Sequence, residues 1–172
     1  MLKYRSNIFQ FVFLLGSLGG FYPSVVVAQN FEAEQANVAF NQQKYSEAVR
    51  WSQQALSRDS LNSSAYQILA ASNLALMKFT DAEIVANQGL KHFPKLNPLI
   101  WFKSEALLQK GLLNEALEGY QKLLTVNSNI SKKDINLRIG LIYQALGGQY
   151  YQQEKFELAE DNLIKAKLYM PD

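Results

Sequence analysis

Side chains that could act as catalysts or metal ligands are sparse along this chain. It contains one histidine, His92, and no cysteine. A hydrolytic triad or a transition-metal site needs several such groups together, and a lone histidine near the end of a predicted helix is better explained by the helix dipole. The pair Gly147-Gly148 lacks the preceding strand of a phosphate-binding loop. Three short acidic clusters are present, at Glu32 and Glu34, at Asp81 and Glu83, and at Glu157, Glu160 and Asp161.

These acidic clusters have a simple structural explanation. The members of the first two pairs are two residues apart, so on a helix they point to different sides. All three clusters are expected early in helices, where acidic side chains interact favourably with the helix dipole. We therefore predict no catalytic residue, no metal site and no cofactor, and an enzymatic function is disfavoured.

The balance of charge disfavours nucleic acid as a partner. The chain carries 17 Lys and Arg against 15 Asp and Glu. Two of the cations, Lys3 and Arg5, lie in the first 28 residues, which contain no acidic residue, so the remainder has 15 of each sign. A nucleic-acid-binding domain is expected to carry a basic stripe. The small cluster of Lys132, Lys133 and Arg138 is interpreted as the solvated start of a helix.

The elements that would position these side chains follow a repeat. The residues Ala48, Ala82 and Ala116 are 34 apart, and Ala159 follows after 43, which is 34 plus a nine-residue insertion. No window alternates between apolar and polar residues as a strand does, so we predict no sheet. A 34-residue period is typical of a helix–turn–helix unit that stacks on copies of itself. Such a stack needs small residues where two helices approach closely, and these are Ala36, Ala70, Ser104 and Gly147 on first helices, facing the four alanines.

The last copy carries the fullest motif. It reads Tyr143-x-x-Leu146-Gly147-x-x-Tyr150, then Ala159-x-x-x-Leu163, Ala166 and Pro171. This pattern resembles the signature of the tetratricopeptide repeat (TPR) family. The resemblance implies an all-α fold, a right-handed superhelix of about four stacked antiparallel helix pairs. The expected repeats are about 29–62, 63–96, 97–130 and 134–172, with first helices near 31–42, 63–76, 97–110 and 135–152 and second helices near 45–58, 79–92, 113–126 and 156–169.

Residues 1–28 precede the repeats and have the layout of a bacterial signal peptide. A basic start is followed by the apolar run 8–18, and Val26-Val27-Ala28 places small residues before a cleavage site between Ala28 and Gln29. The domain would then be residues 29–172, in the periplasm or secreted. The alternative is an uncleaved inner-membrane anchor, because residues 8–28 form an uncharged stretch of spanning length.

In TPR domains the first helices line a concave face, so the resemblance implies that a partner binds there. Family members that clamp an acidic C-terminal peptide use several basic residues on this face. The matching positions here carry no Lys or Arg, so we expect a neutral, partly apolar peptide or helix of another exported protein. Phe40, Trp101 and Leu108 could instead pack within the stack. The predicted partner-binding residues are Asn37, Phe40, Asn41, Gln67, Trp101, Glu105, Leu108, Gln144, Tyr151 and Gln152.

Two features fall outside the regular repeat. The insertion between residues 129 and 140 predicts a first helix that begins about two turns early at Ser131-x-x-Asp134, and that either protrudes as an extra contact or merely lengthens the join. The last helix pair is followed only by Pro171-Asp172, although a solenoid normally ends in a polar cap. Either the chain is the N-terminal part of a longer TPR protein, or this face docks on a partner or on a second copy, giving concentration-dependent association.

The sequence therefore predicts an interaction scaffold or adaptor, used in envelope complex assembly, that makes and breaks no bond. The alternative is a TPR module of a larger complex, anchored in the inner membrane.

Overall fold

The computed structural model describes residues 24–126 and 129–170, with side chains from residue 31 onward. That part of the chain is helical and contains no strand, as predicted. Residues 1–23, which hold most of the predicted signal peptide, lie outside the described residues. None of the described helices combines the length and hydropathy of a bilayer-spanning segment. The helices are α2 (Ser24–Asn41), α3 (Tyr45–Arg58), α4 (Ser63–Ala75), α5 (Phe79–His92), α6 (Asn97–Gln109), α7 (Leu113–Thr125), α8 (Lys132–Gln152) and α9 (Phe156–Tyr169).

The alanine spacing predicts these bounds closely. The second helices α3, α5 and α9 begin and end at the predicted residues, and α7 ends one residue early. The main difference is α2, which begins at Ser24 rather than near residue 31 and therefore includes the expected cleavage junction between Ala28 and Gln29. Consequently Glu32 is not in the first turn of its helix, and the dipole explanation offered for it is wrong. Its buried carboxylate instead pairs with Arg58, with Oε1 2.5 Å from Nη1.

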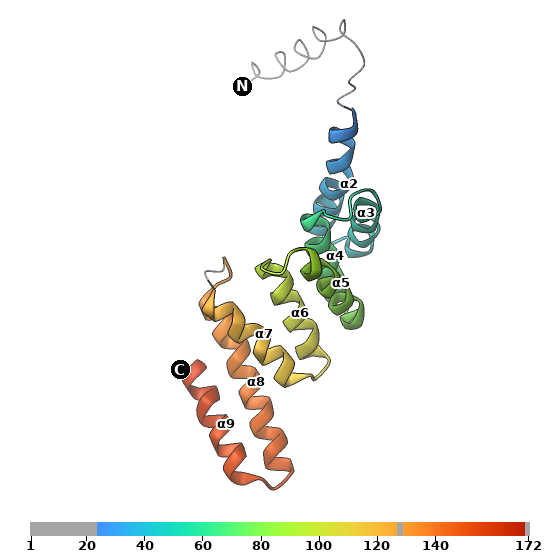
Figure 1. Ribbon diagram of the computed structural model, residues 1–172. Helices are drawn as coiled ribbons and strands as arrows, with labels where there is room; N and C mark the ends of the chain where they lie inside the picture. The colour runs from blue at the N-terminus through green and yellow to red at the C-terminus, as the bar shows by residue number, and fades with distance from the viewer. Residues whose placement is uncertain (1–23, 127–128, 171–172) are drawn as a thin grey trace, which may run out of the picture.

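The helices form four antiparallel hairpins that follow one another along a superhelix (Figure 1). Each second helix packs on the first helix of the next hairpin. The first helices α2, α4 and α6 also pack side by side, whereas within the described residues α3, α5 and α7 do not pack on one another in this way. The stack therefore curves with the first helices on its inner side.

Small side chains lie where the helices of a hairpin approach closely, as the sequence predicts. Ala36, Ala70, Ser104 and Gly147 are buried, and so are the four alanines that set the repeat. At Gly147 a Cβ would lie 3.2 Å from the carbonyl oxygen of Ala159 on α9 and 2.8 Å from Leu163 Cγ. Any larger residue at this position would push the two helices apart.

All four hairpins turn in the same way. The residue at one position of each repeat has a left-handed backbone, with φ of 60° at Gln43, 57° at Met77, 77° at Gly111 and 60° at Glu154. The next residue donates its backbone N–H to the carbonyl five positions earlier, for example from Lys44 to Ala39 at 2.9 Å. This hydrogen bond closes the end of the first helix and sends the chain back antiparallel. Only one of the four turns uses glycine, the residue for which this conformation costs least.

The insertion produces a longer α8 whose added turns are buried. Ser131 is the N-cap, and its hydroxyl accepts a hydrogen bond from the Asp134 N–H at 3.4 Å, as predicted. Ile135 and Ile139 are fully buried against α6 and α7, in one core cluster with Tyr120. Of the two alternatives, these turns do not protrude as an extra contact; they lengthen the join between hairpins. Their apolar side chains, spaced four residues apart, make them part of the joint between the third and fourth hairpins.

Candidate partner-binding face

The predicted binding residues all lie on the first helices α2, α4, α6 and α8, and none of them is fully buried. Phe40, Trp101 and Leu108 do pack against the core clusters of the stack. On each of these helices the predicted residues lie on one side, whereas the other sides carry fully buried residues. The inner side of the stack is therefore accessible along its length. The exposed members are Asn37, Asn41, Gln144, Tyr151 and Gln152, and the half-buried members are Phe40, Gln67, Trp101, Glu105 and Leu108.

A polar hollow lies at the N-terminal end of this face. It has a volume of about 210 Å³ and is bordered by Ala33, Glu34 and Asn37 of α2 and by Asn62 and Ser64 at the start of α4. The Asn62 side chain is occupied, because it accepts a hydrogen bond from the Ala65 N–H at 2.9 Å as the helix cap. The amide of Asn37 and the hydroxyl of Ser64 line the hollow and can form hydrogen bonds to a peptide backbone.

Near the middle of the stack, a hydrogen-bonded cluster joins three helices. One oxygen of the Glu105 carboxylate on α6 accepts a hydrogen bond from the Tyr120 hydroxyl on α7 at 2.6 Å and from Arg138 Nε on α8 at 2.5 Å. Burial and the adjacent carboxylate raise the pKa of Tyr120, so its hydroxyl stays protonated and can donate. The Glu105 carboxylate is therefore satisfied within the fold.

Trp101 belongs to the same cluster. Its ring makes an edge contact with Tyr120, with centroids 5.2 Å apart, and the guanidinium of Arg138 lies over the ring at 5.9 Å. The indole is half-buried, so one part of it packs within the stack while another part remains accessible from the inner side. Trp101 therefore packs within the stack and is also partly accessible, the two environments between which the sequence could not decide.

Arg138 differs from its sequence-based prediction. The sequence predicts a solvated helix start for Lys132, Lys133 and Arg138, and the exposure of the two lysines agrees with it. It is wrong for Arg138, which is half-buried and paired with Glu105. Burial lowers the pKa of its guanidinium, but the hydrogen bond and charge of Glu105 outweigh that effect and raise it. The positive charge of Arg138 lies on the added turns of α8, which have no counterpart in the other repeats.

Three other ionisable groups make contacts within the fold. Glu83 pairs with Lys110 at 2.6 Å, which ties α5 to the end of α6. His92 is the last residue of α5, is exposed, and stacks on Tyr66 with ring centroids 6.1 Å apart. Among the described residues, no three His, Cys, Asp or Glu side chains gather closely enough to hold a metal ion.

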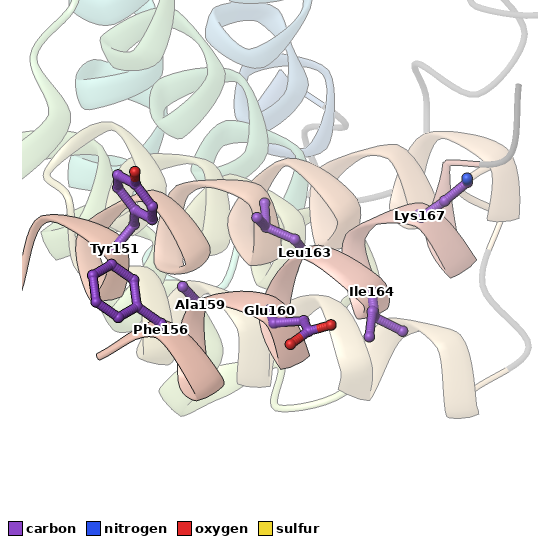
Figure 2. Close-up of a pocket in the computed structure, with 7 residues that line it drawn as sticks. All are labelled: Tyr151, Phe156, Ala159, Glu160, Leu163, Ile164 and Lys167. Atoms are coloured by element: carbon purple, nitrogen blue, oxygen red, sulfur yellow. The ribbon is translucent and has the colours of Figure 1, made fainter. Parts of the chain in front are cut away.

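Tyr151 and Gln152 lie at the far end of α8, beyond the rest of the face. Tyr151 makes an edge contact with Phe156 at the start of α9, with ring centroids 5.5 Å apart. Both rings border a second, apolar hollow on the last hairpin, which Figure 2 shows. Of the ten predicted residues, Tyr151 is therefore the one that also belongs to the end surface of the stack.

Comparison of the backbone with solved structures finds the same architecture in other proteins. The first TPR domain of human RPAP3 has a TM-score of 0.66 and 23% identity, covering 72% of this chain and 95% of that one. The first TPR of Spaghetti (RPAP3), bound to the HSP90 peptide SRMEEVD, has a TM-score of 0.64 and 24% identity, covering 69% and 92%.

YrrB, a TPR protein with an unusual peptide-binding site, has a TM-score of 0.59 and 17% identity, covering 82% of this chain and 86% of that one. Comparisons of the sequence with protein-family models and with curated proteins give no match. The similarity thus lies in the backbone. This chain has the fold of a tetratricopeptide repeat domain, a right-handed superhelix of stacked helical hairpins.

Proposed function

We propose that this protein is an interaction scaffold that binds a peptide or helix of another protein along the inner side of the stack. The observation that carries this proposal is that all ten residues on that side remain at least partly accessible, although the same helices bury their other sides. Two proteins with this fold are described as peptide-binding: Spaghetti binds an HSP90 peptide, and YrrB has a peptide-binding site.

The chemistry of the face favours a neutral, partly apolar ligand. Its accessible polar groups are mainly amides, which can pair with a peptide backbone. Its aromatic and aliphatic members can anchor apolar side chains of a partner. The guanidinium of Arg138, which lies over Trp101, is neutralised by Glu105. A strongly acidic peptide such as SRMEEVD would therefore find few unpaired positive charges here.

We further propose that the protein is exported and that its partner is an exported protein, with a role in assembling envelope complexes. This proposal rests on the layout of residues 1–28. In the alternative, the same segment stays in the inner membrane as an anchor. N-terminal sequencing of the mature protein separates the two: a chain that begins at Gln29 supports cleavage, and one that begins at Met1 supports the anchor.

Photo-crosslinking tests the binding face directly. A crosslinking amino acid is placed at Asn37 or Gln144 on the inner side, and in matched controls at Gln53 or Glu118, which are exposed on second helices. After irradiation in living cells, mass spectrometry should identify the same partner from both inner positions and not from the controls. Equal capture of that partner from the control positions would contradict the proposal.

A second measurement separates contact from folding. Once a partner is identified, Asn37→Ala and Gln144→Ala are expected to weaken binding by roughly three- to tenfold each, in line with the loss of one or two hydrogen bonds to the partner. Both side chains are exposed, so the helical circular dichroism and the melting temperature should not change. Unaltered affinity in the double variant would rule out this face.

A further inference from the structure

The last hairpin carries an open apolar hollow on its outer end. The hollow has a volume of about 430 Å³ and is bordered by Tyr151 at the end of α8 and by one side of α9. Along that side, Leu163 and Ile164 lie between Glu160 and Lys167 (Figure 2). The residues on α9 are Phe156, Ala159, Glu160, Leu163, Ile164 and Lys167.

At Leu163, this surface corresponds to a position that is covered in every other hairpin. In the repeat frame Leu163 matches Ser52, Ala86 and Tyr120, all of which are fully buried where the next hairpin packs. Leu163 itself is 46% exposed. The contact that joins successive hairpins therefore has an unpartnered counterpart on α9. The neighbouring Tyr151 behaves in the same way, being 64% exposed where Phe40, Leu74 and Leu108 are half-buried.

Two residues of this surface differ in type from the residues at the same positions of the earlier repeats. At the position of Lys167 the earlier repeats carry leucine, and at the position of Ile164 they carry Gln53, Asn87 and Gln121. The centre of the surface has thus become more apolar, while its edge has gained a charge. Glu160 and Lys167 are seven residues apart, about 10 Å along one side of the helix, and the midpoint between them falls between Leu163 and Ile164.

A pair of opposite charges placed evenly about an apolar centre is complementary to itself. If two α9 helices lie antiparallel with a two-fold axis at Leu163 and Ile164, Glu160 of each copy faces Lys167 of the other. Self-complementary surfaces of this kind close into dimers. We propose that two copies of this chain associate through the α9 surface in this antiparallel arrangement. Of the ten inner-face residues, only Tyr151 borders this surface. The two-fold contact at Leu163 and Ile164 does not use the other nine, so the dimer does not depend on the proposed peptide binding.

Charge exchange tests the arrangement with the full chain, by analytical ultracentrifugation over a range of concentrations. The wild type should show a monomer–dimer equilibrium. Glu160→Lys or Lys167→Glu alone places like charges opposite each other twice, and should weaken the dimer about tenfold or more. Glu118→Lys, the same change on the exposed side of α7, is the matched control and should leave the equilibrium unchanged.

The decisive sample is a mixture of the two single variants. In a two-fold pair, the chain with Lys at both positions is complementary to the chain with Glu at both, so the mixture should form heterodimers while each variant alone stays monomeric. The double variant E160K/K167E should dimerise like the wild type. A wild type that remains monomeric at high concentration, or dimers that do not respond to these changes, would overturn the proposal.

Discussion

Arg138 on α8 donates a hydrogen bond to the carboxylate of Glu105 on α6 at 2.5 Å, across 33 residues of sequence. The first helices of the earlier hairpins pack along one another, whereas α8 meets the third hairpin chiefly through α7. The Glu105–Arg138 pair therefore spans the inner side where helix contact is sparse. The Tyr120 hydroxyl bonds to the same carboxylate oxygen, so three helices share one acceptor.

We predict that Arg138→Gln lowers the free energy of unfolding by about 1–2 kcal/mol, because it removes a charge-assisted hydrogen bond to a largely buried carboxylate. Glu105→Gln should cost a similar amount. The measurement is urea denaturation followed by circular dichroism. Because the two residues act on each other, the double variant should cost clearly less than the sum of the single variants. Strictly additive effects would show that the pair contributes nothing to stability.

The two adjacent glycines of α8 should respond in opposite directions to alanine. Gly147→Ala places a Cβ 2.8 Å from Leu163 Cγ and 3.2 Å from the Ala159 carbonyl, so it should lower the melting temperature. At Gly148 a Cβ meets nothing within 4 Å. Because alanine favours a helix over glycine by about 1 kcal/mol, Gly148→Ala should raise the melting temperature. Differential scanning calorimetry of the two variants checks this, and equal shifts would contradict the close approach of α8 and α9.

The hairpin turns offer a test of backbone strain. Met77 is exposed and has a φ of 57°, a conformation that costs a residue with a side chain roughly 1–2 kcal/mol. Met77→Gly should therefore raise the free energy of unfolding by roughly 0.5–1 kcal/mol, after allowance for the greater freedom of glycine in the unfolded chain. The reciprocal change, Gly111→Ala, should lower it by about 1 kcal/mol. Thermal melts of both variants should shift in opposite directions.

The added turns of α8 should be important for stability. Ile135 is fully buried, and Ile135→Ala is expected to lower the free energy of unfolding by about 2–5 kcal/mol through lost burial and a residual cavity. Leu137, two residues further on, is 44% exposed, so Leu137→Ala should cost under about 1 kcal/mol. Comparable losses for the two variants, measured by chemical denaturation, would indicate that the helix is not seated on α7 as described.

Much of the fold could be predicted from the sequence because the repeat relates distant residues to one another. The spacing of the four alanines was sufficient to place the second helices. The small residues opposite them predicted the close approach of the two helices within each hairpin. The burial of the start of α8 could also be predicted, because Ile135, Ile139, Ile142 and Leu146 form one apolar stripe along the helix. The sequence predicts the early start of this helix, but it left open whether the added turns protrude or lengthen the join.

The site was harder to predict, because it depends on how hairpins sit relative to each other. The bond between Arg138 and Glu105 joins residues on different repeats across an insertion, and nothing in their local sequence marks them as partners. Trp101 likewise had two possible environments, and only the position of Tyr120 and Arg138 around it shows that it has both. The helix start at Ser24 was missed because the repeat frame begins five residues later.

The alanine contacts also account for how far the sequence can change while the backbone stays the same. Where two helices approach closely, the distance between their backbones depends on small side chains. Each repeat contains only a few of these. Most other positions require only that the side chain be apolar or polar. Chains that share between 17% and 24% of their residues with this one can therefore have the same fold.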